Sequence, residues 1–256
     1  MSTASALSVH HVEHVMGMAV SIDVRDLPAG SNAVGDVVAW LHRVDATFST
    51  YREDSEVTRL GRGEIGIDDL SPDAEEVLLR CIDLTERTGG AFDAFAVPAP
   101  NGTTLDPSGY VKGWSIEHAA RMLEAAGATS FCINAGGDIA IRGVPEPDRP
   151  WRVGIRHPEW ADMVAVTLEL EGPIAVATSA TYERGAHIVD PISGEAVTDI
   201  ASATVVGPDL GVANAYATAV FVMGEGGVDW IESQDGYSAY VITHDGRTRW
   251  SSRFPK

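Results

Sequence analysis

Residues 108–143 read SGYVKGWSIEHAARMLEAAGATSFCINAGGDIAIRG, and within this stretch a helical pattern gives way to strands. The first part predicts a helix that ends at Gly127. The segments FCIN and DIAIRG that follow are predicted as strands. Residues 134–138 (NAGGD) between them have the composition of a hairpin turn, since glycine allows positive φ. The stretch therefore predicts a helix followed by a strand hairpin.

The chain before this stretch is mostly helical in pattern. Residues 12–24 are predicted as one strand. Apolar residues at helical spacing from Val34 to Phe48 then predict an amphipathic helix. A short helix is expected over residues 55–60. A longer one starts at Ser71-Pro72, where serine is the N-cap and proline occupies the first helical position.

The chain after this stretch is mostly strand in pattern. Further strands are expected in the segments WRVGI, VAVTLEL, IAVAT, AHIVD and SATVV, then an apolar helix over residues 212–223, then the strands YSAYVIT and TRW. Helices and strands do not alternate regularly, so a doubly wound parallel sheet is disfavoured. The order predicts the α+β class, with mixed or antiparallel sheets and packed helices.

The composition is that of an acidic chain with enough apolar residues for a core. The 256 residues carry 18 Lys+Arg and 37 Asp+Glu, a net charge of −19, and 45% are hydrophobic. An acidic surface disfavours nucleic acid and anionic membranes as partners. No apolar run reaches the roughly 18 residues of a membrane span, and no signal peptide or lipidation motif is visible. A cytoplasmic protein without membrane insertion is expected.

Two other features resemble binding sites, but simpler interpretations are favoured. Residues 61–66 match the pattern GxGxxG, but no strand precedes them, and a turn is predicted. His10, His11 and His14 have a spacing that could bind a metal. A mobile terminus preorganises nothing, so a flexible N-terminal tail, assigned to residues 1–11, is the favoured interpretation.

Lys112 stands out because the only other lysine in the chain is the C-terminal Lys256. It lies one turn inside a predicted helix whose N-cap is expected at Ser108, with Asp106 just before it. A helix N-terminus offers unpaired N–H groups and the positive end of a dipole, so this segment suits a phosphate. A capped helix with a solvent-facing lysine is an equally weighted alternative.

The apolar helix over residues 212–223 carries two polar residues on one face, Asn214 and Thr218. Oxygen ligands of this kind suit Mg²⁺, although a carboxylate is usually among them. Taken alone, a buried hydrogen-bonded Asn–Thr pair is the safer interpretation. His187 and Asp190 are three residues apart in a predicted strand, which puts them on opposite faces, so no dyad is implied.

Eight segments occur in a fixed order. They are Met16-Gly17, FSTYREDSEVTRL, TGGAFDAF, LDPSGYVKGWSIEHAARML, INAGGDIAIRG, the strand at 151–155, ATSATYERGAHIVDPISG and ANAYATAVFVMG. Together they cover most of the chain from Met16 to Gly224 and resemble the ApbE-type FAD:protein FMN transferases. The resemblance implies a single compact α+β domain of two lobes over residues 12–256, with a flavin site between the lobes.

Members of that family cleave FAD between its phosphates and transfer FMN to a Thr or Ser hydroxyl of an acceptor flavoprotein, releasing AMP with the help of Mg²⁺. The resemblance implies that FAD is the substrate, that Lys112 holds the pyrophosphate and that His187 takes the hydroxyl proton. The implied flavin contacts are Met16, Ala91, Phe92, Asp93, Asp106, Lys112, Thr178, Ser179, His187, Ile188 and Val189. The implied metal ligands are Gly109 through its carbonyl, Asn214 and Thr218.

Three features depart from the family pattern. Asn214 stands where the family usually has Asp, which should weaken Mg²⁺ binding. Gly61 stands where Asn or an aromatic residue is common, and the segment 95–104 is shorter than in typical members. Flavin binding is expected to survive all three. The alternative function is therefore an FAD-binding protein, or an FAD pyrophosphatase, that has lost transfer activity.

Overall fold

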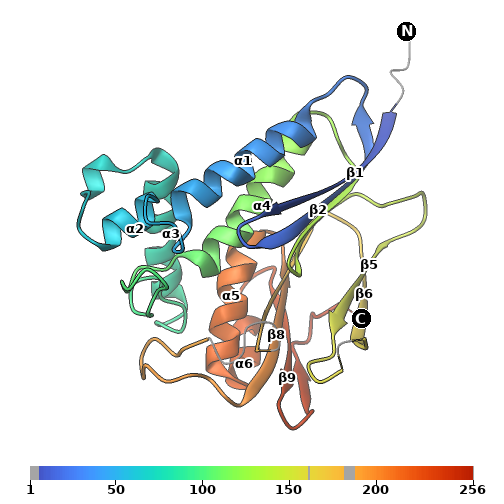
Figure 1. Ribbon diagram of the computed structural model, residues 1–256. Helices are drawn as coiled ribbons and strands as arrows, with labels where there is room; N and C mark the ends of the chain where they lie inside the picture. Colours follow the sequence, from blue (N-terminus) through green and yellow to red (C-terminus); the bar gives the residue numbers. More distant parts are fainter. Residues whose placement is uncertain (1–5, 161, 182–187, 256) are drawn as a thin grey trace.

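The computed structural model describes residues 6–160, 162–181 and 188–255, and an eight-stranded sheet runs through its centre (Figure 1). The strands lie in the order β1-β2-β3-β4-β7-β8-β9-β10, and neighbouring strands are antiparallel. Their bounds are β1 (Ala6–Val15), β2 (Met18–Pro28), β3 (Phe131–Ala135), β4 (Asp138–Arg142), β7 (Ile174–Ala180), β8 (Ile200–Gly207), β9 (Ser238–Thr243) and β10 (Thr248–Trp250).

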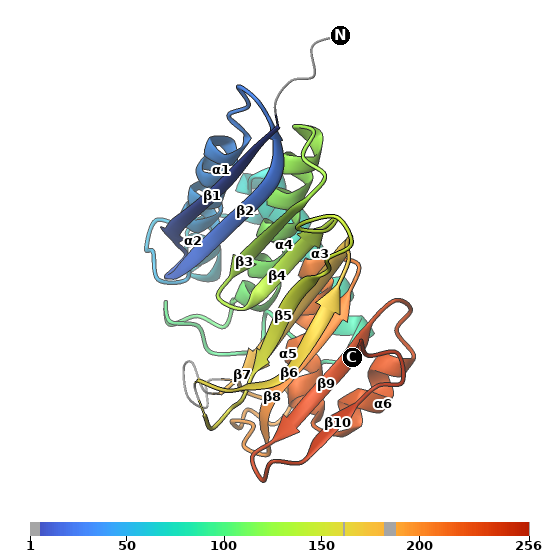
Figure 2. The same cartoon turned by 90° about the vertical axis from the view of Figure 1, so that its right-hand side faces the viewer.

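Helices cover one face of this sheet, and a separate hairpin covers the other (Figure 1, Figure 2). The hairpin consists of β5 (Trp151–Arg156) and β6 (Val164–Leu170), which pair antiparallel. The helices are α1 (Ala33–Phe48), α2 (Glu56–Gly61), the 3-10 helix η1 (Ile67–Asp69), α3 (Pro72–Arg87), α4 (Ser108–Ala125), α5 (Leu210–Met223) and α6 (Gly226–Glu232). The molecule therefore has three layers where the hairpin lies over the sheet.

The apolar character of α5 follows from its place in the middle of the helical side. It contacts α4 on one side and strands β7 and β8 on the other. Small residues of α5, such as Ala213 and Ala217, share one buried core with Ala203 and Val205 of β8. Because β8 is covered on both faces, all eight of its residues are buried.

A second, smaller core fills the space between the sheet and the β5–β6 hairpin. Val176 and Val206 of the sheet pack there against Val153 and Leu168 of the hairpin. Residues adjacent in a strand point to opposite faces, so neighbouring positions of β7 belong to different cores. The α+β class with antiparallel sheets, predicted from the order of segments, is confirmed.

The N-terminal region differs from the prediction. Residues 12–24 belong to two strands rather than one, because Met16 and Gly17, at φ 53° and 71°, form a tight turn between β1 and β2. The expected flexible tail over residues 1–11 is also incorrect from Ala6 onward. That part of the chain pairs with β2, as in the contact of Val9 with Val24.

Three smaller expectations also need correction. Helix α4 begins at Ser108, and its N-cap is Pro107 rather than Ser108. Helix α6 was not expected, since it is short and contains two glycines. The expected strand AHIVD lies partly outside the described residues, and within them Val189 forms only an isolated bridge with Ala196.

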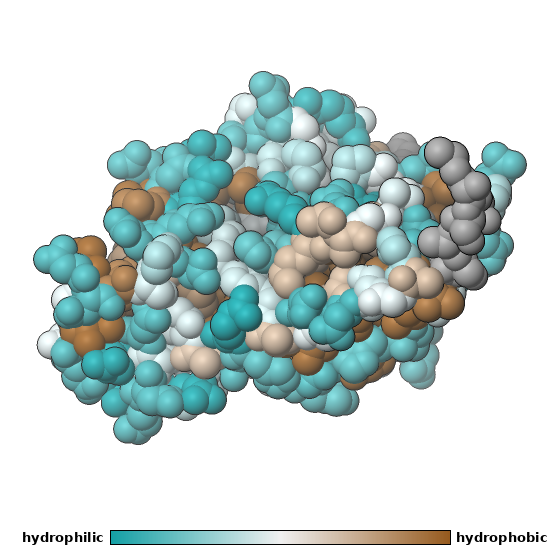
Figure 3. Space-filling model, turned by 90° about the horizontal axis from the view of Figure 1, so that it is seen from above, coloured by the Kyte–Doolittle hydropathy of each residue, from teal (hydrophilic) through white to brown (hydrophobic). Residues whose placement is uncertain are grey.

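The surface seen from the top of Figure 1 is mainly hydrophilic, with separate hydrophobic patches (Figure 3). This agrees with a chain in which acidic residues outnumber basic ones by about two to one. Among the described residues, no helix combines the length and the apolar character that crossing a membrane requires.

Candidate functional site

The buried carboxylate of Asp138 organises a polar cluster where β4, β7, α4 and α5 meet. Asp138 is the first residue of β4 and is fully buried. The Lys112 Nζ lies 2.9 Å from Asp138 Oδ2, and the Asn214 Nδ2 donates to the same oxygen at 2.8 Å. The Thr178 backbone N–H donates to Asp138 Oδ1 at 3.0 Å. A buried carboxylate with three donors is well compensated.

The β3–β4 turn places Asp138 at this point. Gly136 and Gly137 have φ values of 57° and 94°, as the sequence predicted for the turn, and the Asn134 Oδ1 accepts a hydrogen bond from the Gly137 N–H. The regular pairing of β4 with β7 ends at Ile139 and Val176. Asp138 therefore takes over the hydrogen bond to β7 where the ladder stops.

The start of α4 brings Lys112 to the same place. Asp106 Oδ1 accepts a hydrogen bond from the Ser108 N–H at 3.0 Å, so the first N–H of the helix already has a partner. Lys112 lies one turn further on, and its side chain is 27% exposed. The solvent-facing lysine considered as an alternative is not observed, because the ammonium group is turned onto Asp138.

Gly109 lies between Phe92 and Thr218. A Cβ at Gly109 would lie 3.1 Å from the Phe92 ring and 3.5 Å from Thr218 Oγ1. Phe92 is buried and its N–H donates to Thr88 Oγ1, while the neighbouring Asp93 accepts from the Phe95 N–H. The segment of residues 91–93 thus lies directly against the first turn of α4.

The three predicted metal ligands are close together. Thr218 Oγ1 donates to the Asn214 carbonyl at 3.3 Å and lies 3.3 Å from Ser179 Oγ. Among the residues that the structure describes, none donates a hydrogen bond to the buried Asn214 Oδ1. Amide and hydroxyl oxygens of this kind are ligands that fit a hard cation such as Mg²⁺. Among the described residues, no three His, Cys, Asp or Glu side chains form a metal-binding group.

Thr178 and Ser179 present their hydroxyl groups to opposite faces of the sheet. The Thr178 Oγ1 lies 2.9 Å from Thr204 Oγ1, whereas the Ser179 Oγ faces Thr218 on α5. Of these two predicted flavin contacts, only Ser179 brings its hydroxyl to the side of Lys112 and Asp138. Thr178 contributes its backbone N–H to Asp138 instead.

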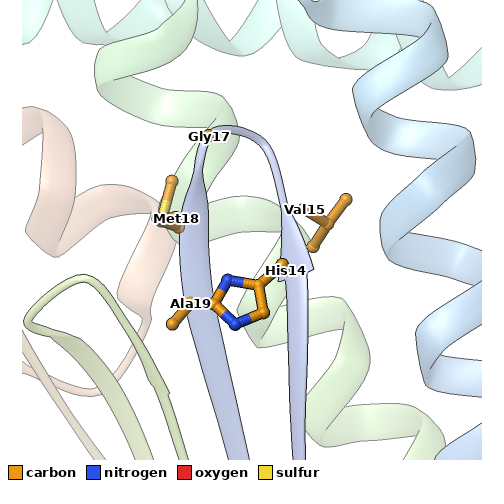
Figure 4. Close-up of a pocket in the computed structure, with 5 residues that line it drawn as sticks. All are labelled: His14, Val15, Gly17, Met18 and Ala19. Atoms are coloured by element: carbon orange, nitrogen blue, oxygen red, sulfur yellow. The ribbon is translucent and has the colours of Figure 1, made fainter.

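The β1–β2 turn, which carries Met16, lies beside the β3–β4 turn. A Cβ at Gly136 would be 3.3 Å from Met18 Sδ. A shallow pocket of about 390 Å³ at the β1–β2 turn is lined by His14, Val15, Gly17, Met18 and Ala19 (Figure 4). Its lining contains none of the Asp138 cluster, so it adjoins the polar cluster without being part of it.

The segment after β7 is described only in part. His187, the predicted base, lies outside the described residues. Ile188 packs against the main core, and Ile192 comes close to Gly90 at the end of α3. Hydrogen bonds from the Ile192 N–H and from Ser193 hold the pKa of Asp190 below its usual value. The Asp190 side chain therefore stabilises the turn formed by residues 190–193.

Two of the departures from the family pattern are in contact with each other. A Cβ at Gly61 would lie 2.8 Å from Thr103 Oγ1, which belongs to the short segment 95–104. Asn101 in the same segment donates to Thr58 Oγ1 of α2 at 3.0 Å. The absence of a side chain at position 61 therefore lets the shortened segment pack onto α2.

Asp138 and Thr204 were not predicted as site residues. Asp138 follows two glycines in a predicted turn. Acidic residues are common in exposed turns, so the composition gave no indication that Asp138 is buried. Thr204 lies in an apolar strand. Threonine is common in strands because of its β propensity, so this residue gave no sign of a functional role. The spacing of Asn214 and Thr218, by contrast, did indicate a shared face.

Comparison with known sequences gives a consistent result. The pattern of the ApbE family matches residues 16–99 and 97–241. The FAD:protein FMN transferase of Rhodobacter capsulatus is 34% identical over 227 residues, which are 84% of this chain and 39% of that protein. That of Haemophilus influenzae is 26% identical over 283 residues, covering 86% of this chain and 82% of that protein. The chain spans under half the length of several curated relatives, such as 43% of the Escherichia coli protein.

Comparison with solved structures concerns the fold. The flavin transferase ApbE from Vibrio cholerae superposes with a TM-score of 0.83 at 23% identity, over 97% of this chain and 98% of that chain. The ApbE protein of Thermotoga maritima gives a TM-score of 0.83 at 21% identity, over 96% of this chain and 97% of that chain. These structures confirm the fold that the eight segments implied, and the match to the ApbE family pattern confirms the resemblance itself.

Proposed function

Because this chain belongs to the ApbE family, we propose that it is an FAD:protein FMN transferase, which moves FMN from FAD to a Thr or Ser hydroxyl of an acceptor flavoprotein and releases AMP. The proposal includes a cytoplasmic location. The observation that supports it most is the Lys112 ammonium, fixed on a buried carboxylate at the junction of α4 and α5. Phosphoryl transfer depends mainly on positioned charge of this kind.

The reaction balances with the groups at hand. The acceptor hydroxyl oxygen attacks the phosphorus on the FMN side, the bond from that phosphorus to the bridging oxygen breaks, and AMP leaves with this oxygen. The hydroxyl proton passes to His187 in this proposal. Lys112 would lie at the pyrophosphate and balance the negative charge that grows on the leaving AMP.

Asn214 Oδ1, Thr218 Oγ1 and the Gly109 carbonyl would hold Mg²⁺. When bound, the cation would supply positive charge that reduces the negative charge of the pyrophosphate. The Asn214 Oδ1 supports this assignment, because it has no donor among the described residues and a buried amide oxygen without a partner is costly unless a donor or a cation meets it. The ligand set is neutral, so affinity for the cation is expected to be weaker than with a carboxylate at position 214.

The flavin contacts are proposed around this cluster. Met16 comes from the β1–β2 turn, residues 91–93 and Asp106 from the chain before α4, Ser179 from β7, and residues 188–189 from the segment that follows it. Of these, Ser179 lies against Thr218, Phe92 lies against the first turn of α4, and the β1–β2 turn lies beside the β3–β4 turn. Thr178 would contact the flavin with atoms other than its hydroxyl, because that group is paired with Thr204.

The test is intact-mass spectrometry of an acceptor fragment that carries a reactive Thr, incubated with the protein, FAD and Mg²⁺. A mass increase of one FMN less one water, together with AMP, is the expected result. AMP without an adduct would instead favour the FAD pyrophosphatase, and bound FAD with neither product would favour a flavin-binding protein. Either of these outcomes with several acceptor fragments would overturn the transferase.

The proposed role of His187 has its own variant. His187→Ala should abolish transfer while FAD binding, measured by the fluorescence of the flavin, stays close to wild type. His244→Ala is the matched control, because His244 is exposed at the β9–β10 turn. An unchanged transfer rate in His187→Ala would remove His187 from the reaction.

A further inference from the structure

Asp138 has more partners than a structural carboxylate at a strand end requires. The buried Oδ2 atom receives two donors of different kinds, the ammonium of Lys112 and the carboxamide of Asn214. The other oxygen, Oδ1, satisfies the Thr178 N–H. One side chain thus connects two helices and two strands of the site.

The contact with Asp138 fixes which atom of Asn214 is free. A carboxylate oxygen can only accept, so the amide must turn its Nδ2 toward Asp138. The Asn214 Oδ1 then points away from Asp138, and it is buried without a hydrogen-bond partner in the described part of the chain. The orientation of this amide is therefore imposed by the charge at position 138.

The same contact restrains Lys112. A lysine side chain is flexible and loses much rotamer freedom when it is held in one place. The Lys112 side chain is 27% exposed, whereas that of Asp138 is 0% exposed, so the pair is open to solvent only from the lysine end. An anion that approaches would meet the ammonium and not the carboxylate.

We propose that Asp138 is the positioning residue of this site, which holds the Lys112 ammonium at the mouth and turns Asn214 so that its Oδ1 stays available. This inference rests on the proposed function for what the two groups act on. Asp138 itself touches neither FAD nor the acceptor. Its single negative charge is what both neighbours respond to.

The first experiment uses the scarcity of lysine in this chain. Lys112 and Lys256 are its only lysines, so reductive methylation followed by peptide mass spectrometry reports the reactivity of Lys112 with Lys256 as the internal reference. Asp138→Asn keeps the shape and the acceptor for Thr178. It should raise the relative labelling rate of Lys112 about tenfold, because the charged partner is lost.

Asp26→Asn is the matched control. Asp26 also accepts several hydrogen bonds, from Thr129 and from the Ser130 N–H, but it belongs to β2 and joins that strand to the chain before β3. A general loosening of the fold would raise Lys112 labelling in both variants. A rise in Asp138→Asn alone is the expected result.

The decisive variant exchanges the two residues. In Asp138→Asn combined with Asn214→Asp, the amide at 138 can donate to the carboxylate at 214, so the hydrogen bond is reversed and the negative charge stays beside Lys112. Labelling of Lys112 should return close to the wild-type rate. Asn214→Asp alone places two carboxylates in contact. In this variant the labelling rate of Lys112 should return to the wild-type value only when a divalent cation is added.

A kinetic measurement separates this inference from the proposed function. Asp138→Asn should lower kcat for AMP release from FAD about 100-fold and change FAD affinity far less. The reason is that Lys112 keeps its charge at the open end of the site but loses its fixed position. The exchange variant should regain most of this loss. If the wild type releases no AMP, the proposed function fails while the labelling experiment still tests Asp138.

Two results would overturn the inference. One is a Lys112 labelling rate in Asp138→Asn equal to that of the wild type. The other is an exchange variant, folded by circular dichroism, that labels as fast as Asp138→Asn.

Discussion

Gly113 of α4 and Asn214 of α5 are in contact at the crossing of the two helices. A Cβ at Gly113 would lie 2.9 Å from the Asn214 Cβ and 2.3 Å from the Leu210 carbonyl oxygen. The first turns of α4 and α5 can therefore approach only with glycine at this position. The close approach brings Lys112 and Asn214 to the same oxygen of Asp138.

Gly113→Ala should lower the free energy of unfolding by about 3 kcal/mol, because the added methyl group meets backbone atoms that cannot move aside separately. Urea unfolding followed by circular dichroism measures the change. Gly226→Ala is the control, since no atom of the described residues lies within 4 Å of a Cβ at Gly226 in α6. It should change stability by less than about 1 kcal/mol. Equal effects of the two variants would contradict the tight crossing.

Arg142→Ala should cost about 3 kcal/mol of stability, because it takes from the buried Glu117 carboxylate its nearest charged partner and, among the described residues, leaves only Arg121, at 3.8 Å. Arg142 Nη2 lies 2.6 Å from Glu117 Oε1, and both side chains are over 90% buried. The double variant Arg142→Met/Glu117→Met should cost less than Arg142→Ala, since no charge then remains buried. Thermal unfolding of the two variants gives the comparison.

The control for the Arg142 pair is the exposed pair of Arg149 and Glu146, 3.1 Å apart. Arg149→Ala should change stability by about 0 to 1 kcal/mol. A larger loss in Arg149→Ala than in Arg142→Ala would show that burial does not govern these pairs.

Thr178→Val and Ser179→Ala should have opposite profiles, although the two residues are adjacent. Thr178→Val removes the only hydroxyl partner described for the fully buried Thr204 and should cost about 1 to 3 kcal/mol of stability. Ser179→Ala should leave stability nearly unchanged and weaken FAD binding. Urea unfolding and a flavin-fluorescence titration of each variant test this; a weakened FAD affinity in Thr178→Val alone would contradict the assignment of faces.

His118 should make stability depend on pH. Its ring stacks on Trp40 at 4.0 Å, and burial lowers its pKa from the ordinary value of 6.5. Because the unfolded chain binds this proton more tightly, the contribution of His118 is fully present above about pH 6.5 and is lost as the pH falls through the folded pKa. His118→Phe keeps a ring on Trp40 and cannot titrate.

The measurement is the unfolding free energy of wild type and His118→Phe at a series of pH values from about 7 to 5. The wild type should lose more stability than the variant over this range. Parallel curves would mean that the folded and unfolded states bind the His118 proton equally well.

Periodicity predicted the elements with a clear apolar face. Helix α1 has buried residues at helical spacing, and α3 has the predicted Ser71 cap, which accepts the Ala74 N–H. Strand pairing was harder to predict. The turn at Met16-Gly17 contains a non-glycine residue at positive φ, which composition does not reveal, so β1 and β2 were taken as one strand.

The site could be predicted in part because some of its residues share a face within one element. Asn214 and Thr218 are four residues apart on a helix, and the family resemblance implied that they act together with Gly109. Asp138 could not be found in this way. Its contacts reach residues 40 and 76 positions further along the chain, and only the tertiary structure brings them together.

This separation along the chain has a consequence for biosynthesis. The Asp138 cluster requires α4, the β3–β4 turn, β7 and α5, so loops of tens of residues must close before it exists. A nascent chain that has not yet delivered α5 from the ribosome lacks the Asn214 contact, however well its first half has folded. Affinity for the nucleotide would then arise late, and FAD would stabilise only chains whose synthesis has passed α5.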